Sequence, residues 1–328
     1  MQITRRRFGQ GALGVAAVAG GLTTIGGARA ERSLLYGNAG NAESASNTFA
    51  ASWAEEVAAR SGGETVIEIK AGTLGGEKDI LDGCSLGTVD IYNGAYTGLR
   101  EFDVFYAPYF ARDSDHAYRI VYDLLGGQLN DAFADRYNVH FMHIGRAGPW
   151  KLFLKKEISS FGDLAGMKIR APQIEGVVAG LEQLGAKPTV IPFNEVYSAL
   201  QQGVVDGMAT LGNLGISQKF YEVAEFVVMN DWGIGLDKQV MHRPLWDDLG
   251  PETTGLMTET WIEMEPTGFF GATMEREADD FAKWEEFNGP GTVLELDATE
   301  AQELLKPAVA ALTDDIFGPG TYDKIQAL

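Results

Sequence analysis

Beyond residue 30, short apolar segments alternate with segments whose apolar residues recur at helical spacing. The first three short apolar segments are residues 33–36, 65–70 and 89–92. Residues 46–60 and 77–86 lie between them and have the spacing of amphipathic helices. This βαβαβ order predicts parallel strands joined by right-handed crossovers, in a sheet that helices cover on both faces.

A second stretch of alternation follows a predicted long helix at residues 115–137. The elements predicted after it are strands 140–144 and 152–154, strand 168–170, helix 175–184, strand 187–191, helix 195–202 and strand 205–208. Asn194 directly precedes the last of these helices. We expect it to be the N-cap, because an asparagine side chain accepts a hydrogen bond from a free N–H group of the first turn.

The C-terminal part of the chain is predicted to be mainly helical. Its elements are strands 225–229 and 239–242 and the helical segments 252–287 and 299–317. Pro266 and Gly268 should kink or break the first of these helices. Two sheets with long helices packed across both predict a two-lobed α/β architecture, with a cleft between the lobes where a small ligand binds.

The domain organisation is predicted from the same pattern. We expect residues 31–150 to form mainly lobe I, residues 151–240 to form mainly lobe II, and residues 241–328 to form C-terminal helices that pack across both lobes. No low-complexity linker separates the lobes. The chain should therefore cross between them more than once, and several crossings form a hinge.

Residues 1–30 have the order of a cleaved export signal. A cluster of arginines precedes a Gly/Ala-rich apolar run at residues 11–25, and small residues flank a predicted cleavage site after Ala30. The run has too many glycines for a stable membrane anchor, which is the alternative interpretation. The pair Arg5-Arg6 followed by Phe8 resembles the twin-arginine export signal, so we expect the mature protein in the periplasm.

Acidic residues outnumber basic residues, which restricts the partners. The sequence has 26 Lys and Arg and 46 Asp and Glu, a formal charge of −20, and loss of residues 1–30 with their four arginines and no acid would make it −24. Such a charge repels nucleic acid and anionic lipid. An anionic ligand therefore needs a local cationic group, and we look for a buried arginine.

Cys84 is the only cysteine, which excludes an internal disulfide and a thiolate metal cluster.

One segment matches a catalytic motif. Residues 83–87 fit G-x-S-x-G, but Ser85 is predicted at the end of a helix and before a strand. A nucleophile elbow has the reverse arrangement, with a strand before the serine and a helix after it. We therefore do not predict an enzyme.

Metal-ligating residues are sparse. His140 and His143 are three positions apart on a predicted strand, so they should face opposite sides and cannot share a metal ion. Asp231 and Asp237 could hold a hard cation beside a ligand, although they are more simply interpreted as loop acids in solvent. We predict no metal and no other cofactor.

Five segments resemble one family of receptors. They are TLGGEKDILDGCSLGTVDI at residues 73–91, FDVFYAPYFARDSDHAYRI at 102–120, ISSFGDLAGMKIRAP at 158–172, LEQLGAKPTVIPFNEVYSALQQGVVDG at 181–207 and SQKFYEVAEF at 217–226. In order and spacing these resemble the solute receptors of tripartite ATP-independent periplasmic (TRAP) transporters, of the dicarboxylate-receptor (DctP) type. The similarity covers essentially the whole mature chain.

The resemblance implies a periplasmic-binding-protein-like fold, in which each lobe is a sheet flanked by helices and a long helix spans both lobes. It also implies closure of the lobes on a small organic anion, a carboxylate, with the ligand at the interface. The implied partners are that anion and the TRAP membrane subunits. Neither nucleic acid nor stable insertion into a membrane is implied.

Three positions of the resemblance concern the ligand. Arg170 occupies the position of the family's carboxylate-clamping arginine, whose planar guanidinium offers two parallel N–H donors. Phe193 matches the family's aromatic residue beside the ligand, although it could pack in the core instead. Many members have a ligand-binding Asn where this chain has Thr210; Asn213 lies three residues on, and either residue could serve.

Trp150 is a departure from the family pattern. Many members, notably the sialic-acid receptors, carry a second arginine at this position. Arg146 and Lys151 are near enough in sequence to compensate, but a tryptophan here predicts a flat or apolar wall. The departure favours a monocarboxylate with an apolar body over a dicarboxylate or sialic acid.

Polar residues also follow two predicted strands of lobe I. Asn38 and Asn41 follow the first strand, and Tyr92, Asn93 and Tyr96 lie at the end of the third. Ligands of open α/β sheets bind at the C-terminal ends of strands, so we expect these residues near the ligand.

The sequence thus predicts an extracytoplasmic receptor that serves a TRAP transporter. A secreted lyase or hydrolase would need an acid/base pair in the cleft, and the sequence offers an anion clamp without a visible pair. Presentation of the ligand to a membrane sensor kinase is the alternative role.

Overall fold

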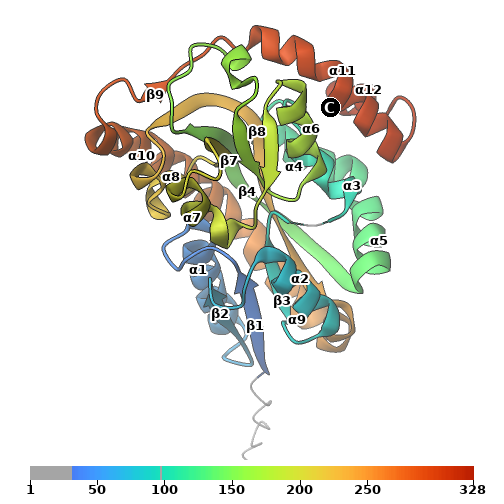
Figure 1. Ribbon diagram of the computed structural model, residues 1–328. Coiled ribbons are helices and arrows are strands. Elements are labelled where there is room, and N and C mark those ends of the chain that lie inside the picture. Colours follow the sequence, from blue (N-terminus) through green and yellow to red (C-terminus); the bar gives the residue numbers. More distant parts are fainter. Residues whose placement is uncertain (1–31, 97) are drawn as a thin grey trace, which may run out of the picture. The chain divides into compact units, whose positions relative to one another are not determined.

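A computed structural model describes residues 32–96 and 98–328, which form one compact unit. The predicted export signal lies outside the described residues. Within them, nine strands form one sheet in the order β2-β1-β3-β8-β4-β7-β5-β6, with β9 paired to β8 (Figure 1). The strands are β1 (Arg32–Asn38), β2 (Thr65–Ala71), β3 (Ile91–Gly94), β4 (Val139–Leu154), β5 (Lys168–Ala171), β6 (Lys187–Val190), β7 (Gly207–Leu211), β8 (Phe226–His242) and β9 (Val293–Leu294).

Helices connect the strands much as the sequence pattern predicts. The α-helices are α1 (Ala45–Arg60), α2 (Glu77–Leu86), α3 (Arg100–Asp103), α4 (Ser114–Arg119), α5 (Gly126–Tyr137), α6 (Glu175–Gln183), α7 (Val196–Gln201), α8 (Leu214–Ser217), α9 (Arg243–Met264), α10 (Ala272–Asn288), α11 (Thr299–Phe317) and α12 (Thr321–Ala327). The π-helical segments are η2 (Ile120–Leu125) and η6 (Glu265–Gly271), and the 3-10 turns are η1 (Val104–Tyr106), η3 (Phe161–Leu164), η4 (Phe193–Glu195) and η5 (Phe220–Glu222). Ser85 closes α2, as predicted, so it does not follow a strand.

The sheet has two halves that share the two long strands β4 and β8. In the first half β1 pairs in parallel with β2 and β3, which confirms the predicted βαβαβ unit, and β3 pairs with the end of β8. In the second half β5 pairs in parallel with β6 and β7, and β7 pairs with the end of β4. The antiparallel pair β4–β8 therefore connects the halves, and each half corresponds to a lobe of the two-lobed α/β fold.

The prediction of four short strands in place of β4 and β8 is wrong. Each pair of predicted strands is one continuous strand, because glycines interrupt the hydrophobic pattern without ending the strand. Gly148 of β4 pairs with Gly235 of β8. A Cβ atom on Gly235 would lie 2.7 Å from the backbone oxygen of Gly148, so the close approach of the two strands requires glycine.

A β-bulge changes the orientation of the two histidines on β4. The register of β4 with β8 shifts between Phe141 and His143. As a result the His140 ring stacks on Trp246 with 4.0 Å between centroids, and the His143 ring stacks on Trp261 at 4.2 Å. Both tryptophans belong to α9. The prediction that the histidines face opposite sides is therefore wrong, because an extra residue in a bulge cancels the alternation.

A long, irregular helix connects the two halves on one face. The chain runs from α9 through the π-helical segment η6 into α10, and η6 contains both Pro266 and Gly268, where an irregularity was predicted. The first part, α9, packs on α1, while α10 packs on α8 and β9. Within the described part of the chain, no helix is both long and apolar enough to cross a membrane.

The predicted N-cap role of Asn194 is wrong. Asn194 lies inside the 3-10 turn η4, and α7 begins two residues later at Val196. Pro192 precedes the turn, and its fixed backbone angle starts the turn earlier than the pattern of polar residues indicates.

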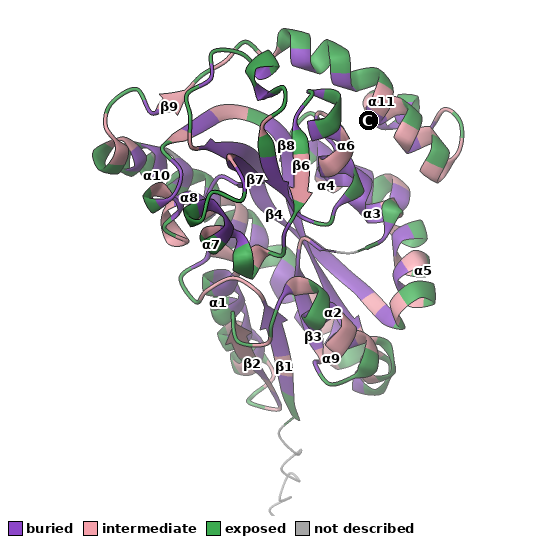
Figure 2. Ribbon diagram, in the orientation of Figure 1, coloured by how far each residue is buried: buried purple, intermediate pink, exposed green. Residues whose placement is uncertain are grey.

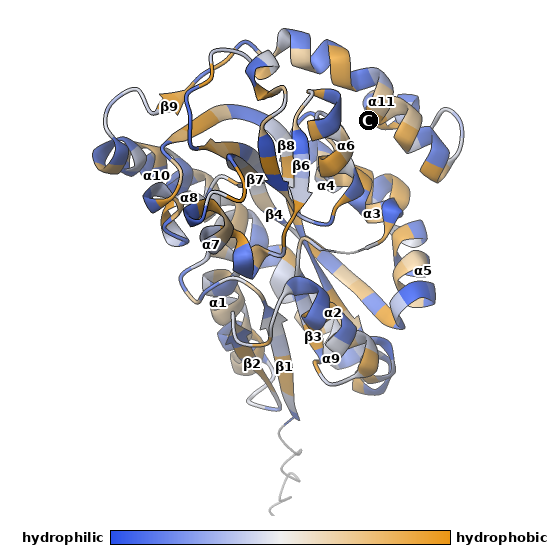
Figure 3. Ribbon diagram, in the orientation of Figure 1, coloured by the Kyte–Doolittle hydropathy of each residue, from blue (hydrophilic) through white to orange (hydrophobic). Residues whose placement is uncertain are grey.

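The core consists of two clusters of buried side chains, one large and one in the second half of the sheet. The second cluster forms around Phe153, Phe220 and Trp284. Figure 2 shows the strands largely buried and the outer faces of α10 and α11 exposed. Figure 3 shows the same division in hydropathy, with hydrophobic residues on the strands and hydrophilic residues on these outer faces. Burial of apolar surface thus fixes the strand ends that surround the site described next.

Candidate functional site

A pocket lies between the two halves of the sheet, where strands of both halves end. Its empty volume is about 550 Å³, including the space at its mouth. The first half contributes Asn38, Ala39, Gly40, Ser44, Ser46, Glu77, Gly94 and Ala95. The second half contributes Arg170, Pro172, Phe193, Thr210, Leu211 and Leu214, and the shared strands contribute Trp150 and Asp237.

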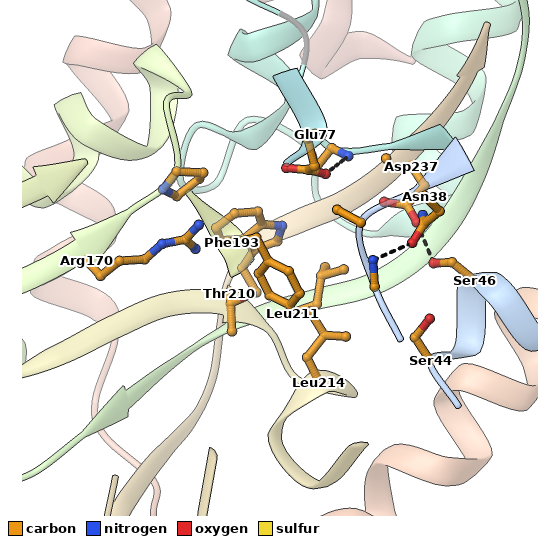
Figure 4. A pocket seen from close by; sticks show the side chains of 16 residues that line it. Asn38, Ser44, Ser46, Glu77, Arg170, Phe193, Thr210, Leu211, Leu214 and Asp237 are labelled. Atoms are coloured by element: carbon orange, nitrogen blue, oxygen red, sulfur yellow. Dashed lines mark hydrogen bonds between the residues drawn. The ribbon is translucent and has the colours of Figure 1, made fainter. Parts of the chain in front are cut away.

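Arg170 extends from β5 into this pocket (Figure 4). The residue is only 2% exposed, and among the described residues its guanidinium makes no ion pair. Its Nε donates to the carbonyl oxygen of Ile191 at 2.9 Å and Nη1 donates to that of Ala209 at 3.4 Å. Burial lowers the pKa of Arg170 to about 10, and the group is still charged at neutral pH. Nη2 has no partner among the described residues, which makes this arginine a buried cation with free donor capacity.

Phe193 and Thr210 lie on the same side of the pocket as Arg170. The Phe193 ring lies 6.0 Å from the Arg170 guanidinium carbon and packs edge-on against Phe220, with 6.2 Å between ring centroids. Thr210 is buried on β7 and lines the pocket. Asn213 does not line it, because its side chain turns away and donates to the carbonyl oxygen of Ala147 at 3.0 Å.

Trp150 forms a wall of the pocket from the middle of β4. The residue is 3% exposed, and its ring packs on Tyr106 with 5.8 Å between centroids. Its indole Nε1 is buried and has no hydrogen-bond partner among the described residues. The wall is therefore aromatic, with one N–H donor left unsatisfied.

The two basic neighbours of Trp150 lie elsewhere and have acidic partners. Arg146 pairs with the buried Glu265 at 2.6 Å and also contacts Asp115. Lys151 pairs with Glu277 at 3.1 Å and also contacts Asp231. Neither residue lines the pocket, so the expected compensation for a missing second arginine is not seen.

Asn38 lines the pocket from the end of β1, and Asn93 supports it from behind. The Asn38 side chain donates to the carbonyl oxygen of Asn93 at 3.1 Å and to its side-chain oxygen at 3.0 Å. Its own oxygen accepts from the backbone N–H of Gly40 at 2.7 Å and from Asn47 at 3.1 Å. This network fixes the chain reversal after β1, and Asn93 lies behind it without facing the pocket.

Tyr92, Tyr96 and Asn41 also lie outside the pocket lining. Tyr92 is buried in the core, and its hydroxyl donates to the carbonyl oxygen of Tyr96 at 3.0 Å. Tyr96 lines an adjoining cavity, which shares Glu77 and Arg170 with the pocket. Asn41 donates from its side chain to the carbonyl oxygen of Ser217 at 3.0 Å.

Two carboxylates line the pocket together with Arg170, and the sequence interpretation did not assign them to it. Asp237 on β8 is 4% exposed and accepts a hydrogen bond from the hydroxyl of Ser46 at 2.5 Å. Burial raises the pKa of Asp237 to about 6, and the charge of Glu77 adds to the rise. Glu77 begins α2 and accepts from the backbone N–H of Ala95 at 2.8 Å (Figure 4).

The interpretation of Asp237 as a loop acid in solvent is wrong, because this residue lies within a buried strand. Asp231 is exposed. Within the described residues, no group of three or more His, Cys, Asp or Glu side chains is arranged to hold a metal ion. Glu77 could have been found from its place at the start of a helix that follows a strand end, where parallel α/β sheets bind ligands.

Comparison with known proteins identifies relatives over most of the chain. A family model described as bacterial extracellular solute-binding protein, family 7 (DctP), matches residues 36–317. A solute-binding protein of Roseobacter denitrificans is 31% identical over 204 residues, which are 60% of this chain and 62% of that protein. The sialic acid-binding periplasmic protein SiaP of Vibrio cholerae is 26% identical over 180 residues, which are 54% of this chain and 56% of that protein. The chain thus matches less than two thirds of the length of these relatives.

Solved structures share the fold over nearly their whole length. A TRAP periplasmic solute-binding protein of Roseobacter denitrificans with bound L-galactonate has a TM-score of 0.81 and 25% identity, over 90% of this chain and 99% of that chain. A TRAP periplasmic solute-binding protein of Sulfurospirillum deleyianum with bound succinate has a TM-score of 0.81 and 23% identity, over 91% of this chain and 99% of that chain. The second of these likenesses concerns the fold alone.

Proposed function

Since this chain belongs to the DctP family of bacterial extracellular solute-binding proteins, as the sequence segments predicted, we propose that it is a receptor for a small organic carboxylate. The receptor binds its ligand in the pocket between the sheet halves and delivers it to the membrane subunits of a TRAP transporter. It binds without turnover. Residues 1–30 are an export signal that is removed after Ala30, and the mature protein works in the periplasm.

Arg170 is the observation that carries this proposal. A buried guanidinium without an ion pair is costly unless a partner neutralises it, and a carboxylate in the pocket would be that partner. The guanidinium offers the planar donors that a carboxylate accepts in pairs. An acidic protein surface provides no general attraction for an anion, so this local charge must supply it.

The basic residues of the pocket support one carboxylate per ligand. Among the described residues that line it, Arg170 is the only Lys or Arg, and Trp150 stands where the sequence resemblance places the second arginine of other members. Arg146 and Lys151 are neutralised by Glu265 and Glu277, respectively. The solved structure with bound L-galactonate supports an organic acid as the ligand class.

Closure of the two halves completes the site. The pocket takes side chains from both halves, and the antiparallel strands β4 and β8 connect them. A ligand that contacts both halves favours the closed arrangement over the open one by its difference in affinity for the two. This supports a hinge mechanism, in which the membrane subunits recognise the closed, loaded receptor.

A thermal-shift screen of organic acids tests the proposal. A ligand that binds only the folded protein stabilises it by about 2.7 kcal/mol when its concentration is a hundredfold above the dissociation constant. We expect at least one carboxylate to raise the melting temperature and to be recovered unchanged after incubation, as judged by NMR. Absence of any stabilising acid would contradict the receptor assignment, and consumption of the acid would show an enzyme instead.

A further inference from the structure

The pocket has a donor side and an acceptor side. On one side, Nη2 of Arg170 has no hydrogen-bond partner among the described residues. On the other side, Asp237 presents carboxylate oxygens, and those of Glu77 lie between Arg170 and Asp237. Figure 4 shows Arg170 entering the pocket from the side opposite to Asp237 and Ser46. A ligand that fills this pocket therefore meets donors at one end and acceptors at the other.

Asp237 is a buried carboxylate without a cationic partner among the described residues. One of its oxygens accepts from the hydroxyl of Ser46, and the other has no partner there. Lys238 follows it in the chain but extends to the opposite face of β8, where its ammonium donates to the carbonyl oxygen of Gly94 at 2.8 Å. That ammonium also lies 4.6 Å from the centre of the Tyr92 ring. A carboxylate in such a place is costly until a cation neutralises it.

Glu77 adds a second negative charge to the pocket. One of its oxygens accepts from the backbone N–H of Ala95, and among the described residues no Lys or Arg forms an ion pair with it. The pocket therefore holds two carboxylates and one guanidinium. A purely anionic ligand would satisfy Arg170 but would be repelled by the other end. A ligand with one charge of each sign is complementary to both ends.

We propose that Asp237 and Glu77 form a cation subsite, and that the ligand is an amino-carboxylate whose ammonium lies between these two side chains while its carboxylate lies on Arg170. The inference rests on the proposed function, because Arg170 must hold the carboxylate. An ammonium suits the subsite better than a hydroxyl does. It supplies three hydrogen-bond donors and a positive charge, whereas a hydroxyl supplies one donor and leaves both carboxylates without an ion-pair partner.

Matched pairs of ligands test this subsite on the exported protein. The probes are β-alanine, 4-aminobutyrate, 5-aminovalerate and a set of α-amino acids, each compared by isothermal titration with the hydroxy acid of the same skeleton. We expect at least one amino acid to bind about tenfold or more tightly than its hydroxy partner. Equal or tighter binding of the hydroxy acid, or no binding of any amino acid at about 10 mM, would overturn the inference.

Two nearly isosteric variants assign the effect to the subsite. Asp237→Asn should weaken binding of the amino acid by about thirtyfold or more and that of the hydroxy acid by less than about threefold. Glu77→Gln, at a half-buried position, should shift the affinities in the same direction and serves if Asp237→Asn does not fold. An unchanged preference for the amino acid in a folded variant would overturn the inference.

An inorganic cation or a polyhydroxy acid in the pocket would give results that differ from those of an amino acid. If a simple carboxylate such as propionate binds only with sodium or calcium present, and Asp237→Asn removes that requirement, the subsite holds an inorganic cation and the inference is wrong. If only polyhydroxy acids such as galactonate bind, and Arg170→Ala abolishes their binding, the inference is also wrong. The proposed receptor function would stand in both cases, because the carboxylate would still be bound.

Discussion

Asn41, in the loop after β1, donates a hydrogen bond to the carbonyl oxygen of Ser217, at the end of α8, over 3.0 Å. Asn41 follows β1 of the first half of the sheet and Ser217 follows β7 of the second half, and Leu214 of the same α8 helix lines the pocket. This hydrogen bond therefore joins the halves beside the ligand site and forms only when they are close together. The contribution of this hydrogen bond to closure can be measured separately from that of the residues that contact the ligand.

Replacement of Asn41 by Ala should make the ligand leave faster. Loss of one neutral hydrogen bond costs about 0.5–1.5 kcal/mol, which corresponds to an increase of roughly two- to tenfold in the dissociation rate. Stopped-flow fluorescence with the ligand found in the screen measures this rate. Asn130→Ala is the control, because its side chain accepts from the backbone N–H of Phe141 within one half. Equal dissociation rates for the two variants would contradict the role of Asn41 in closure.

Asp237 should reduce the stability of the ligand-free protein as the pH rises from about 4 to 6. Burial raises the pKa of this carboxyl from 3.8 to about 6, so the folded protein holds the proton more tightly than the unfolded chain does. The stabilisation that comes from the protonated Asp237 carboxyl is fully present below its unfolded-state pKa of 3.8. It is lost as the pH rises through the folded-state pKa of about 6. Among the groups around it, Glu77 raises the pKa of Asp237, while Ser46 and Lys238 lower it.

Urea unfolding of wild type and Asp237→Asn across this pH range tests the prediction. The variant has no proton to lose, so its free energy of unfolding relative to wild type should rise by up to about 3 kcal/mol between pH 4 and 6 and then level off. Lys238 does not interfere, because burial lowers its pKa only to about 7, outside the window. A difference that stays constant with pH would contradict the buried, unpaired state of Asp237.

The sequence predicted those helices and strands whose apolar residues recur at the spacing of the element they form. The bounds of α11 and the βαβαβ unit follow from clear apolar spacing between polar turns. The long strands β4 and β8 do not, because glycines are required where the strands approach closely, and these resemble turn residues in the sequence. A bulge near His143 likewise has no signal in the spacing of apolar residues.

The same limit applies to the site. Arg170, Phe193, Trp150, Thr210 and Asn38 were proposed from motifs or strand ends, and all five line the pocket. Asp237 was interpreted as solvent-exposed, because an acidic residue among polar neighbours gives no sign that its strand is buried. Arg146 was considered as a ligand contact. The sequence does not reveal its pairing with Glu265, because Glu265 lies on a helix more than a hundred residues further along the chain.

Glu265→Gln should destabilise the fold without a large effect on binding. It removes the carboxylate that pairs with the buried Arg146, and breaking a buried ion pair costs about 3–5 kcal/mol. Urea unfolding measures the loss, and titration should show less than a threefold change in ligand affinity, about 0.6 kcal/mol. The matched control is Glu263→Gln, whose pair with Arg60 at 2.7 Å is exposed to solvent and should stabilise the fold far less. Similar losses in the two variants would contradict the structural role of Arg146.

Replacement of Arg5 and Arg6 by Lys should leave the precursor in the cytoplasm. The paired arginines before Phe8 and a glycine-rich apolar run are typical of the twin-arginine route. Cell fractionation and immunoblotting follow the precursor and the mature form. Processing at the normal rate in the Lys-Lys variant would indicate the general secretory route instead.

The affinity of Arg170→Ala for the ligand tests the central claim most directly. Removal of this guanidinium leaves a carboxylate desolvated in the pocket without its partner, a loss of about 2–5 kcal/mol, which corresponds to roughly thirtyfold to several thousandfold in affinity. Arg170→Lys should recover little of it, because an ammonium does not present two parallel donors. Arg100→Ala is the control, since Arg100 is exposed and pairs with Glu175 and Asp315 outside the pocket. Isothermal titration should show the loss only in the Arg170 variants, whereas near-normal affinity in Arg170→Ala, with its circular dichroism spectrum unchanged, would contradict the carboxylate clamp.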